Sequence, residues 1–153
     1  MSHPHHSIQR VGAADVHELL PLMRAYCDFY EVSPTDTQLM AITDALIADP
    51  EHEGLQLIAR EDAGAATGFA TVFWSWSTTD GGRIGVMNDL FVVEAARGGG
   101  IAEQLIEACR QAAADHGAGQ LTWQTAPDNA RAQRVYERVG GHRERWVDYW
   151  LPC

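Results

Sequence analysis

The chain has 153 residues, of which 46% are hydrophobic and 21% charged, a composition that indicates one globular domain and excludes a disordered chain. Its formal net charge of −10 disfavours a nucleic-acid partner, because nucleic acids bind to basic surfaces. No apolar run is long enough to cross a membrane, and the start of the chain lacks the apolar stretch of a signal peptide. We therefore expect a cytoplasmic protein without a membrane partner.

Two small groups of residues raise the question of metal or redox chemistry. Cys27, Cys109 and Cys153 form no cluster, and two of them fall on apolar faces of expected helices, which favours buried thiols in a reducing compartment. The start, MSHPHHS, has three histidines within four positions, which either bind a metal or belong to a frayed terminus. We expect residues 1–7 to be disordered and expect no metal site.

Apolar periodicity, caps and turns predict helices and strands along the whole chain. Thr35, followed three residues later by Gln38, predicts a capping box at a helix start. The expected helices cover residues 14–30, 35–49, 101 to about 115, and 129–139, and the expected strands cover residues 8–11, 55–60, 67–77, 83–93, 121–125 and 143–151. We therefore expect an α/β (α+β) fold in which about four helices flank a mixed, mostly antiparallel central sheet.

The stretch RGGGIA, residues 97–102, places three glycines between an expected strand and an expected helix. Backbone N–H groups at a helix start lack partners, the helix dipole adds positive potential, and glycine has no Cβ to hold a ligand away. The pattern favours a cradle for phosphate or pyrophosphate, while the alternative is a loop that needs positive φ for packing alone. It matches neither a Walker loop nor the Gly-x-Gly-x-x-Gly dinucleotide fingerprint.

The wider segment VMNDLFVVEAARGGGIAEQLI resembles the central motif of the GNAT superfamily of N-acetyltransferases. The signature of that family, Arg/Gln-x-x-Gly-x-Gly/Ala, reads here as Arg97, Gly98, Gly99, Gly100, Ile101 and Ala102. A second family pattern is similar to Asn129, Ala132, Tyr136 and Gly140, and the order of elements fits nearly the whole chain. The resemblance implies an acetyl-CoA-dependent enzyme that acetylates a primary amine and occupies residues 1–153 as one domain.

The resemblance also implies where acetyl-CoA binds. Backbone groups near the end of the expected strand 83–93 would pair with the pantetheine arm, and amides of the glycine stretch would hold the pyrophosphate. Asn129 would hydrogen-bond the arm, although it equally suits the N-cap of its helix. Arg131, Arg134 and Arg138 either reach a nucleotide phosphate or form a solvated helix face. The implied cofactor residues are Phe91, Val92, Arg97, Gly98, Gly99, Gly100, Ile101, Ala102 and Asn129.

Acetyl transfer needs a base for the amine and an acid for the leaving thiolate. An alkylamine has a pKa of about 10.4, so exposing its lone pair at pH 7 costs roughly 4–5 kcal/mol, whereas a thiol with a pKa of about 8.5 leaves with modest help. Tyr136 lies where family members have a tyrosine that protonates the sulfur, so the resemblance implies a catalytic role. The alternative is a core tyrosine on the apolar helix face of Ala132, Val135 and Val139.

The residues expected to bind the acceptor amine match the family less closely than those expected to bind acetyl-CoA. MNDLFV loosely resembles the diamine and polyamine acetyltransferases, which carry Glu-Asp before the aromatic residues. Asn88 stands where those enzymes have a glutamate base, and an amide cannot take the proton. Asp89 follows, but strand alternation predicts that it points to the other face, so the base and the polyamine assignment stay open. The candidate acceptor residues, which suit a cation but also suit core or exposed positions, are Asp28, Tyr30, Glu31, Trp74, Trp76 and Asn88.

Three functions follow from the sequence. The first is acetylation of a small-molecule amine such as a polyamine, and the second is acetylation of a protein N-terminus or lysine. The third is a non-catalytic acetyl-CoA-binding regulatory module, against which the presence of Tyr136 argues. The sequence does not fix the oligomeric state, so a homodimer stays open.

Overall fold

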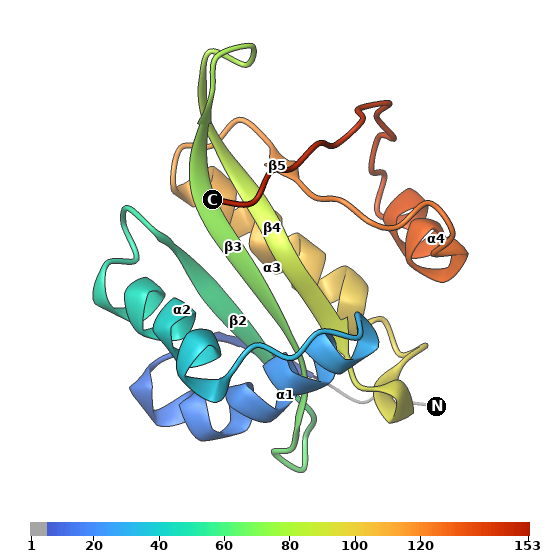
Figure 1. Cartoon of the computed structure of the whole chain (residues 1–153). Helices are drawn as coiled ribbons and strands as arrows, with labels where there is room; N and C mark the ends of the chain where they lie inside the picture. The colour runs from blue at the N-terminus through green and yellow to red at the C-terminus, as the bar shows by residue number, and fades with distance from the viewer. Residues whose placement is uncertain (1–5) are drawn as a thin grey trace.

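The computed structural model describes residues 6–153 and contains helices on both faces of a five-stranded sheet (Figure 1). The helices are α1 (Val16–Phe29), α2 (Asp36–Ala48), α3 (Ile101–Asp115) and α4 (Ala130–Arg138), with 3₁₀ turns at Ala13–Asp15 and Glu94–Ala96. The strands are β1 (Ser7–Arg10), β2 (Gly54–Arg60), β3 (Ala66–Ser77), β4 (Gly82–Val92) and β5 (Leu121–Thr122). Helices α1 and α2 cover one face, α3 covers the other, and α4 lies apart from the sheet.

The strands follow the order β1-β2-β3-β4-β5 across the sheet. The first four are antiparallel neighbours, and β5 joins β4 in parallel. A parallel pair needs a long crossover connection, which α3 provides between β4 and β5. The expected mixed, mostly antiparallel sheet with four helices is thereby confirmed.

The expectation that residues 1–7 are disordered can be compared with the structure only from residue 6 onward. Residues 1–5, which include His3 and His5, lie outside the described residues. Ser7 pairs with Arg60 at the start of β1, so the expected disorder is corrected at this residue. Among residues 6–153, no helix combines the length and the apolar character needed to span a membrane.

Two apolar cores lie on the two faces of the sheet, because successive strand residues point to opposite sides. Val72 of β3 and Leu105 of α3 are fully buried on the α3 face. Leu19 of α1 and Phe69 of β3 are at most 1% exposed on the face covered by α1 and α2. Burial of such a side chain contributes about 1.5–3 kcal/mol, so both cores hold β3 and β4 in place.

Polar contacts fix the two helices of the α1–α2 face. Arg60 at the end of β2 places Nη2 2.8 Å from Asp15 Oδ1 and 3.0 Å from Glu18 Oε1 and so ties the start of α1 to the sheet. At the start of α2, the predicted capping box is present. The Gln38 amide donates to Thr35 Oγ1 at 3.1 Å, and the Thr35 amide donates to Gln38 Oε1 at 2.8 Å.

The expected strand at residues 143–151 does not form, and the expected strand 121–125 shortens to β5. Within the part of the chain that the structure describes, no backbone hydrogen bond involves residues 142–153. A strand exists only through bonds to a neighbouring strand, and these residues have no such neighbour.

Candidate active site

The glycine stretch forms a bare backbone loop at the start of α3. Gly98 has a φ of +85° and Gly100 a φ of +83°, values that disfavour residues with a Cβ. A Cβ built on either glycine would meet no atom within 4 Å, so open space borders the loop. Positive φ and open space together fit both sequence interpretations, a ligand cradle and a special turn.

The loop amides point to the first of these interpretations. In residues 6–153, the backbone N–H groups of Gly98 to Ala102 donate to no protein acceptor. They lie at the N-terminus of α3, a helix of 15 residues whose dipole adds positive potential there. Several unpaired donors beside open space can bind an anion such as a pyrophosphate.

Arg97 braces this loop. Its Nε donates to the carbonyl of Val92 at 2.9 Å, and its guanidinium carbon lies 5.9 Å from the ring centroid of Phe91. The side chain therefore holds the loop against the end of β4, and the free donors of the loop are backbone amides.

The outer edge of β4 is unpaired next to the loop. β5 pairs with β4 only at Gly85 and Val86. From Met87 to Val92 this edge has no neighbouring strand among the described residues. The Phe91 side chain packs with the α1–α2 core and that of Val92 is buried on the α3 face. The backbone of this edge can therefore accept an extended ligand in the manner of an added strand.

A β-bulge at Asn88 changes which side of the sheet the neighbouring side chains of β4 reach. Val72 pairs with Met87 and Thr71 with Asp89, so Asn88 is the extra residue. Thr71 and Asp89 therefore share the α1–α2 face, and Asn88 Nδ2 donates to Asp89 Oδ1 at 3.0 Å on that side. The expectation that Asp89 points to the other face is wrong, because alternation fails at a bulge.

Asp89 is a half-buried carboxyl group at the end of a hydrogen-bonded series. Burial raises its pKa above the ordinary value, and hydrogen bonds from Thr71, Asn88 and Tyr26 offset part of that rise. Tyr26 of α1 places its hydroxyl 3.3 Å from the carbonyl of Asn88. A carboxylate with a raised pKa is a stronger base than an ordinary aspartate and can accept a proton from a bound group.

Buried polar side chains hold Thr71 in place. Gln56 Nε2 donates to Thr71 Oγ1 at 3.1 Å, and Thr43 Oγ1 donates to Gln56 Oε1 at 2.8 Å. All three side chains are at most 2% exposed. Because Thr71 Oγ1 accepts from Gln56, its own proton is free to donate to Asp89.

Tyr136 lies on α4, near Tyr30 at the end of α1. Its ring packs edge-on against Trp123, with centroids 5.4 Å apart. Burial, followed by proximity to Tyr30, raises the pKa of Tyr136, and a hydrogen bond with Thr125 opposes the rise. The phenol thus stays protonated at neutral pH and can donate a proton. Asn129 caps the helix by accepting from the Ala132 amide at 3.2 Å.

The end of α1 brings aromatic and acidic side chains to this face. Tyr30 packs against Tyr26 with ring centroids 5.0 Å apart and is 45% exposed. Asp28 and Glu31 are exposed beside it, and Glu31 has a φ of +57°. Of this helix end, Tyr26 reaches β4, because its hydroxyl lies 3.3 Å from the Asn88 carbonyl. A role of Asp28, Tyr30 and Glu31 in binding the acceptor stays a prediction.

Trp74 does not join this group, and the expectation for it is corrected. Its side chain lies in the core on the α3 face, because it shares the facing of Val72. The indole stacks on His116 with ring centroids 4.2 Å apart and donates to the Pro50 carbonyl at 2.8 Å. Trp76 is 71% exposed near the hairpin end, where Arg83 covers its ring.

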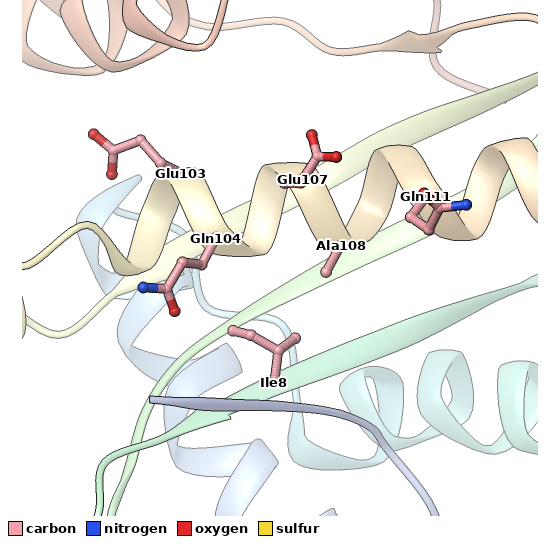
Figure 2. A pocket seen from close by; sticks show the side chains of 6 residues that line it. All are labelled: Ile8, Glu103, Gln104, Glu107, Ala108 and Gln111. Atoms are coloured by element: carbon pink, nitrogen blue, oxygen red, sulfur yellow. The ribbon is translucent and has the colours of Figure 1, made fainter. Parts of the chain in front are cut away.

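A hollow lies elsewhere, between β1 and the outer face of α3. It has a volume of about 570 Å³ and is lined by Ile8, Glu103, Gln104, Glu107, Ala108 and Gln111 (Figure 2). Its two glutamates repel phosphate groups, and Glu103 forms an ion pair with Arg138 that links α3 to α4. This hollow therefore does not suit a nucleotide cofactor, and Arg138 is engaged with protein rather than free for a phosphate.

Comparison of the sequence with known protein families identifies the family of this chain. Residues 19–141, which run from α1 through α4, match the model of the Acetyltransferase (GNAT) family. The chain belongs to the GNAT family of acetyltransferases. The family match therefore includes β4, the glycine loop and Tyr136.

Relatives in sequence and structure agree with this family. The uncharacterized N-acetyltransferase YhfO of Bacillus subtilis (strain 168) is 33% identical over 146 residues, which are 95% of this chain and 96% of that protein. A solved probable acetyltransferase has a TM-score of 0.83 and 26% identity over 96% of this chain and 97% of its own. The expected GNAT fold and the expected class, an acetyl-CoA-dependent N-acetyltransferase, are confirmed.

A second similar structure shares the fold alone. It is AAC(6')-Iy in complex with a CoA bisubstrate analog, with a TM-score of 0.84 and 24% identity over 97% of this chain and 99% of that one.

Sequence reasoning missed Tyr26, Thr71 and the true facing of Asp89. The order Asn-Asp on a strand gave no sign of the bulge, because a bulge at a non-glycine residue has no composition signal of its own. The position of Tyr26 one helical turn before Tyr30 was a usable signal, since residues four apart share a helix face.

Proposed function

We propose that the whole chain acts as one domain that transfers the acetyl group of acetyl-CoA to a primary amine of a small polycationic molecule. One observation carries this proposal: the half-buried Asp89 carboxylate lies on the α1–α2 face of β4, on the same stretch as the unpaired edge. A cationic amine suits this carboxylate and the rings of Tyr26 and Tyr30, and the exposed Asp28 and Glu31 at the end of α1 add negative charge.

In this proposal, the donor lies along the unpaired edge of β4. Backbone groups near Phe91 and Val92 pair with the pantetheine arm, and the amides of Gly98 to Ala102 receive the pyrophosphate. The free donors and the open space at Gly98 and Gly100 support that assignment. Asn129 bonds the arm with its side-chain amide while its oxygen caps α4.

The acid–base assignment follows from the environments of two side chains. Asp89 takes the proton of the bound ammonium group, in place of the base that Asn88 cannot supply. The amine nitrogen then forms a bond to the acetyl carbon, the carbon–sulfur bond breaks, and Tyr136 gives its proton to the leaving sulfur. The nitrogen loses its second proton, which restores the Tyr136 phenol, and Asp89 releases the first proton to solvent, so that the products are one amide, one thiol and one proton. The raised pKa of Asp89 supports its role, since it makes this carboxylate a better base, and Tyr136 is protonated at neutral pH and so has a proton to give.

Polyamines and aminoglycosides are the acceptor classes that we favour. Both carry several ammonium groups, which match a face with more than one carboxylate. The fold likeness to AAC(6')-Iy, whose solved complex holds an acetylneamine derivative of CoA, adds support. Asn88, which hydrogen-bonds Asp89, then orients the base rather than acting as one.

A thiol-release assay with acetyl-CoA tests the proposal directly. The panel contains polyamines, aminoglycosides, amino acids, and peptides with free N-termini or lysines. We expect turnover with the first two classes. Turnover with peptides alone would move the acceptor to proteins, and binding of acetyl-CoA without turnover on any amine would indicate a non-catalytic module.

The pH profile of Asp89→Asn tests the base. Since burial raises the pKa of Asp89, activity should rise with pH as this carboxyl ionises, at a pH above the usual range of aspartate, and then level off once the carboxyl is ionised. The variant should lose about 10²–10⁴-fold in kcat/KM and should follow the neutral amine, rising about tenfold per pH unit.

The matched control for this variant is Asp62→Asn, an exposed turn carboxylate that should change nothing. A wild-type rate that itself rises about tenfold per unit from about pH 6 to 9 would show that no protein base operates.

A further inference from the structure

A row of polar side chains crosses three strands on the face covered by α1 and α2. The strand register places Gln56 of β2 opposite Thr71 of β3, and Thr71 opposite Asp89 of β4. Side chains directly opposite each other in an antiparallel pair have Cβ atoms about 4.5–5.5 Å apart, so polar groups at such positions can bond. The row therefore connects β2 to the carboxyl group that is proposed as the base.

The row depends on the bulge at Asn88. On one side of the bulge Val72 pairs with Met87, and on the other side Thr71 pairs with Asp89. If the pairing continued without a bulge, Asn88 would stand opposite Thr71 and the next side chain would point to the other face. The bulge thus brings the carboxyl group, rather than the amide, into line with the polar residues of β2 and β3.

Gln56 and Thr71 occupy positions of the apolar core. Both are at most 2% exposed, and they share their face of the sheet with Ile58 and Phe69, which are core residues at most 1% exposed. Burial of an amide or a hydroxyl costs free energy that an apolar side chain of similar size does not cost, and hydrogen bonds only offset that loss. Core packing alone therefore does not explain these two polar residues.

The hydrogen bonds of these residues all run toward Asp89. Thr43 Oγ1 of α2 donates to Gln56 Oε1 at 2.8 Å, and Gln56 Nε2 donates to Thr71 Oγ1 at 3.1 Å. Thr71 in turn donates to the Asp89 carboxyl group. We call Thr43, Gln56 and Thr71 the donor series. Hydrogen bonds in such a series polarise one another, and a bond that ends on a charged acceptor is stronger than one between neutral groups.

The side-chain amide of Gln56 gives the donor series its direction. Its oxygen accepts from Thr43, and its NH₂ group donates to Thr71 and, at 3.8 Å, to Met23 Sδ. If the amide were turned round, its oxygen would take the single hydroxyl proton of Thr71, and Asp89 would lose a donor. The orientation of Gln56 and the ionised state of Asp89 are therefore coupled.

We propose that Gln56 is a positioning residue, which directs the hydroxyl proton of Thr71 onto Asp89 and so keeps this carboxylate ionised and oriented toward the acceptor amine. The proposal rests on the proposed function, in which Asp89 takes the proton of the amine. Gln56 is buried two strands away from Asp89, so it acts through Thr71 and not by contact with a substrate. Thr43 holds the Gln56 amide in the orientation that this role needs.

The other groups around Asp89 differ from the donor series in charge or in exposure. From α1, the titratable side chains that face Asp89 are Tyr26 and Cys27, and burial raises the pKa of both, so both are uncharged at neutral pH. On β4 itself, Asn88 donates to Asp89 at 3.0 Å, but Asn88 is exposed. Water competes with an exposed donor, whereas the donor series is shielded from water, so its last bond should have the larger effect on the carboxylate.

Titration of the Asp89 carboxyl carbon by NMR in the full chain tests the proposal without any substrate. Thr71→Val removes a donor to the charged form, so the pKa of Asp89 should rise by about one pH unit. Gln56→Met keeps the size of the side chain and removes its amide, and should raise this pKa by about half a unit. Added to Thr71→Val, it should cause no further rise, because Gln56 acts through Thr71.

The matched control is Thr67→Val. It removes another buried hydroxyl from β3, one that donates to the Ala59 carbonyl at 3.3 Å, and should leave the titration of Asp89 unchanged. Thr71→Ser keeps the hydroxyl and should titrate like the wild type, which gives a test even if the valine variant does not fold. Circular dichroism checks the fold of each variant.

The pH profile of kcat/KM then connects the donor series to catalysis. The rise of activity on the acid side should move to higher pH by the same amounts, so that Thr71→Val is about tenfold slower than the wild type well below the pKa of Asp89 and closer to it at high pH. An unchanged titration of Asp89 in both single variants overturns the proposal, as does an effect of Gln56→Met that persists in the absence of the Thr71 hydroxyl. A shifted titration with an unmoved rate profile supports the role of Gln56 toward the carboxylate and overturns instead the assignment of Asp89 as the base.

Discussion

The part of the chain up to α3 and the part after it are built differently. In the described residues, every buried side chain lies at or before Ala113, whereas α4 buries none. The first part carries Asp89 on a strand that is packed from both sides, and the glycine loop lies between that strand and α3. The second part carries Tyr136 on a helix held by the Trp123 contact and the Glu103–Arg138 ion pair.

The difference separates two tasks of the site. The group proposed to take the amine proton lies on β4, which is packed from both sides, and the amides proposed to hold the pyrophosphate lie between β4 and α3, both of which are packed into the core. The group proposed to protonate the sulfur lies where little apolar area fixes it. Local stability follows buried contacts, so α4 should open more readily than β4. Each of the following experiments either contradicts this difference between the two parts of the chain or measures its size.

The largest effect should come from the core of the first part. Leu105→Ala removes a fully buried side chain of α3 and should lower the free energy of unfolding by about 2–5 kcal/mol. Val139→Ala, at the end of α4, removes a side chain that is 37% exposed and should cost less than about 0.5 kcal/mol. Urea denaturation of both variants measures the contrast, and equal losses would contradict it.

Tyr136→Phe should lower kcat about 10²-fold at unchanged KM, because the proton is needed only as the sulfur leaves and a thiolate departs fairly well unaided. Stopped-flow measurement of the chemical step on a good acceptor checks this. Tyr149→Phe removes an exposed hydroxyl and should leave the rate unchanged. A full rate in Tyr136→Phe would make Tyr136 a structural residue.

The two ends of α3 allow a matched test of the glycine loop. Gly100 and Gly117 have φ values of +83° and +86°, and a Cβ on either would meet no atom. Alanine at each position should therefore cost a similar backbone strain, roughly 1–2 kcal/mol. Only Gly100→Ala should also weaken acetyl-CoA binding, by about tenfold in calorimetric titration. Equal affinities of the two variants would rule out the cradle.

The smallest effect should come from the ion pair between the two parts. Arg138 Nη2 lies 2.6 Å from Glu103 Oε1, and its side chain is 60% exposed. Arg138→Ala should lower stability by about 0.2–1 kcal/mol, and added salt should shrink the difference. Thermal unfolding at low and high salt measures it. A salt-independent loss above this range would show that Arg138 acts through packing.

Local signals predicted much of the fold and the donor half of the site. The capping box of Thr35 and Gln38, the Asn129 cap and the glycine loop each depend on a few adjacent residues, so the sequence contains the full cause. The helices and most strands follow from apolar periodicity for the same reason. The resemblance to the family then assigned expected roles to these positions.

The remaining features depend on contacts between distant residues. The facing of Trp74 was hidden because β3 is apolar on both sides, so alternation could not tell its two faces apart. The bulge at Asn88 arises from pairing with β3 and has no local signal. The expected strand at 143–151 has a strand sequence but no partner in its own chain.

The bulge at Asn88 also bears on how functional positions are aligned among relatives. At a bulge, two consecutive side chains reach the same side of the sheet, so a carboxylate at either residue can serve the same face. An ancestral exchange of the pair Asn-Asp would move the proton acceptor by one residue without changing the backbone. Conservation counted column by column would record the loss of a functional residue where chemistry is retained, so this stretch of β4 is better compared as a pair.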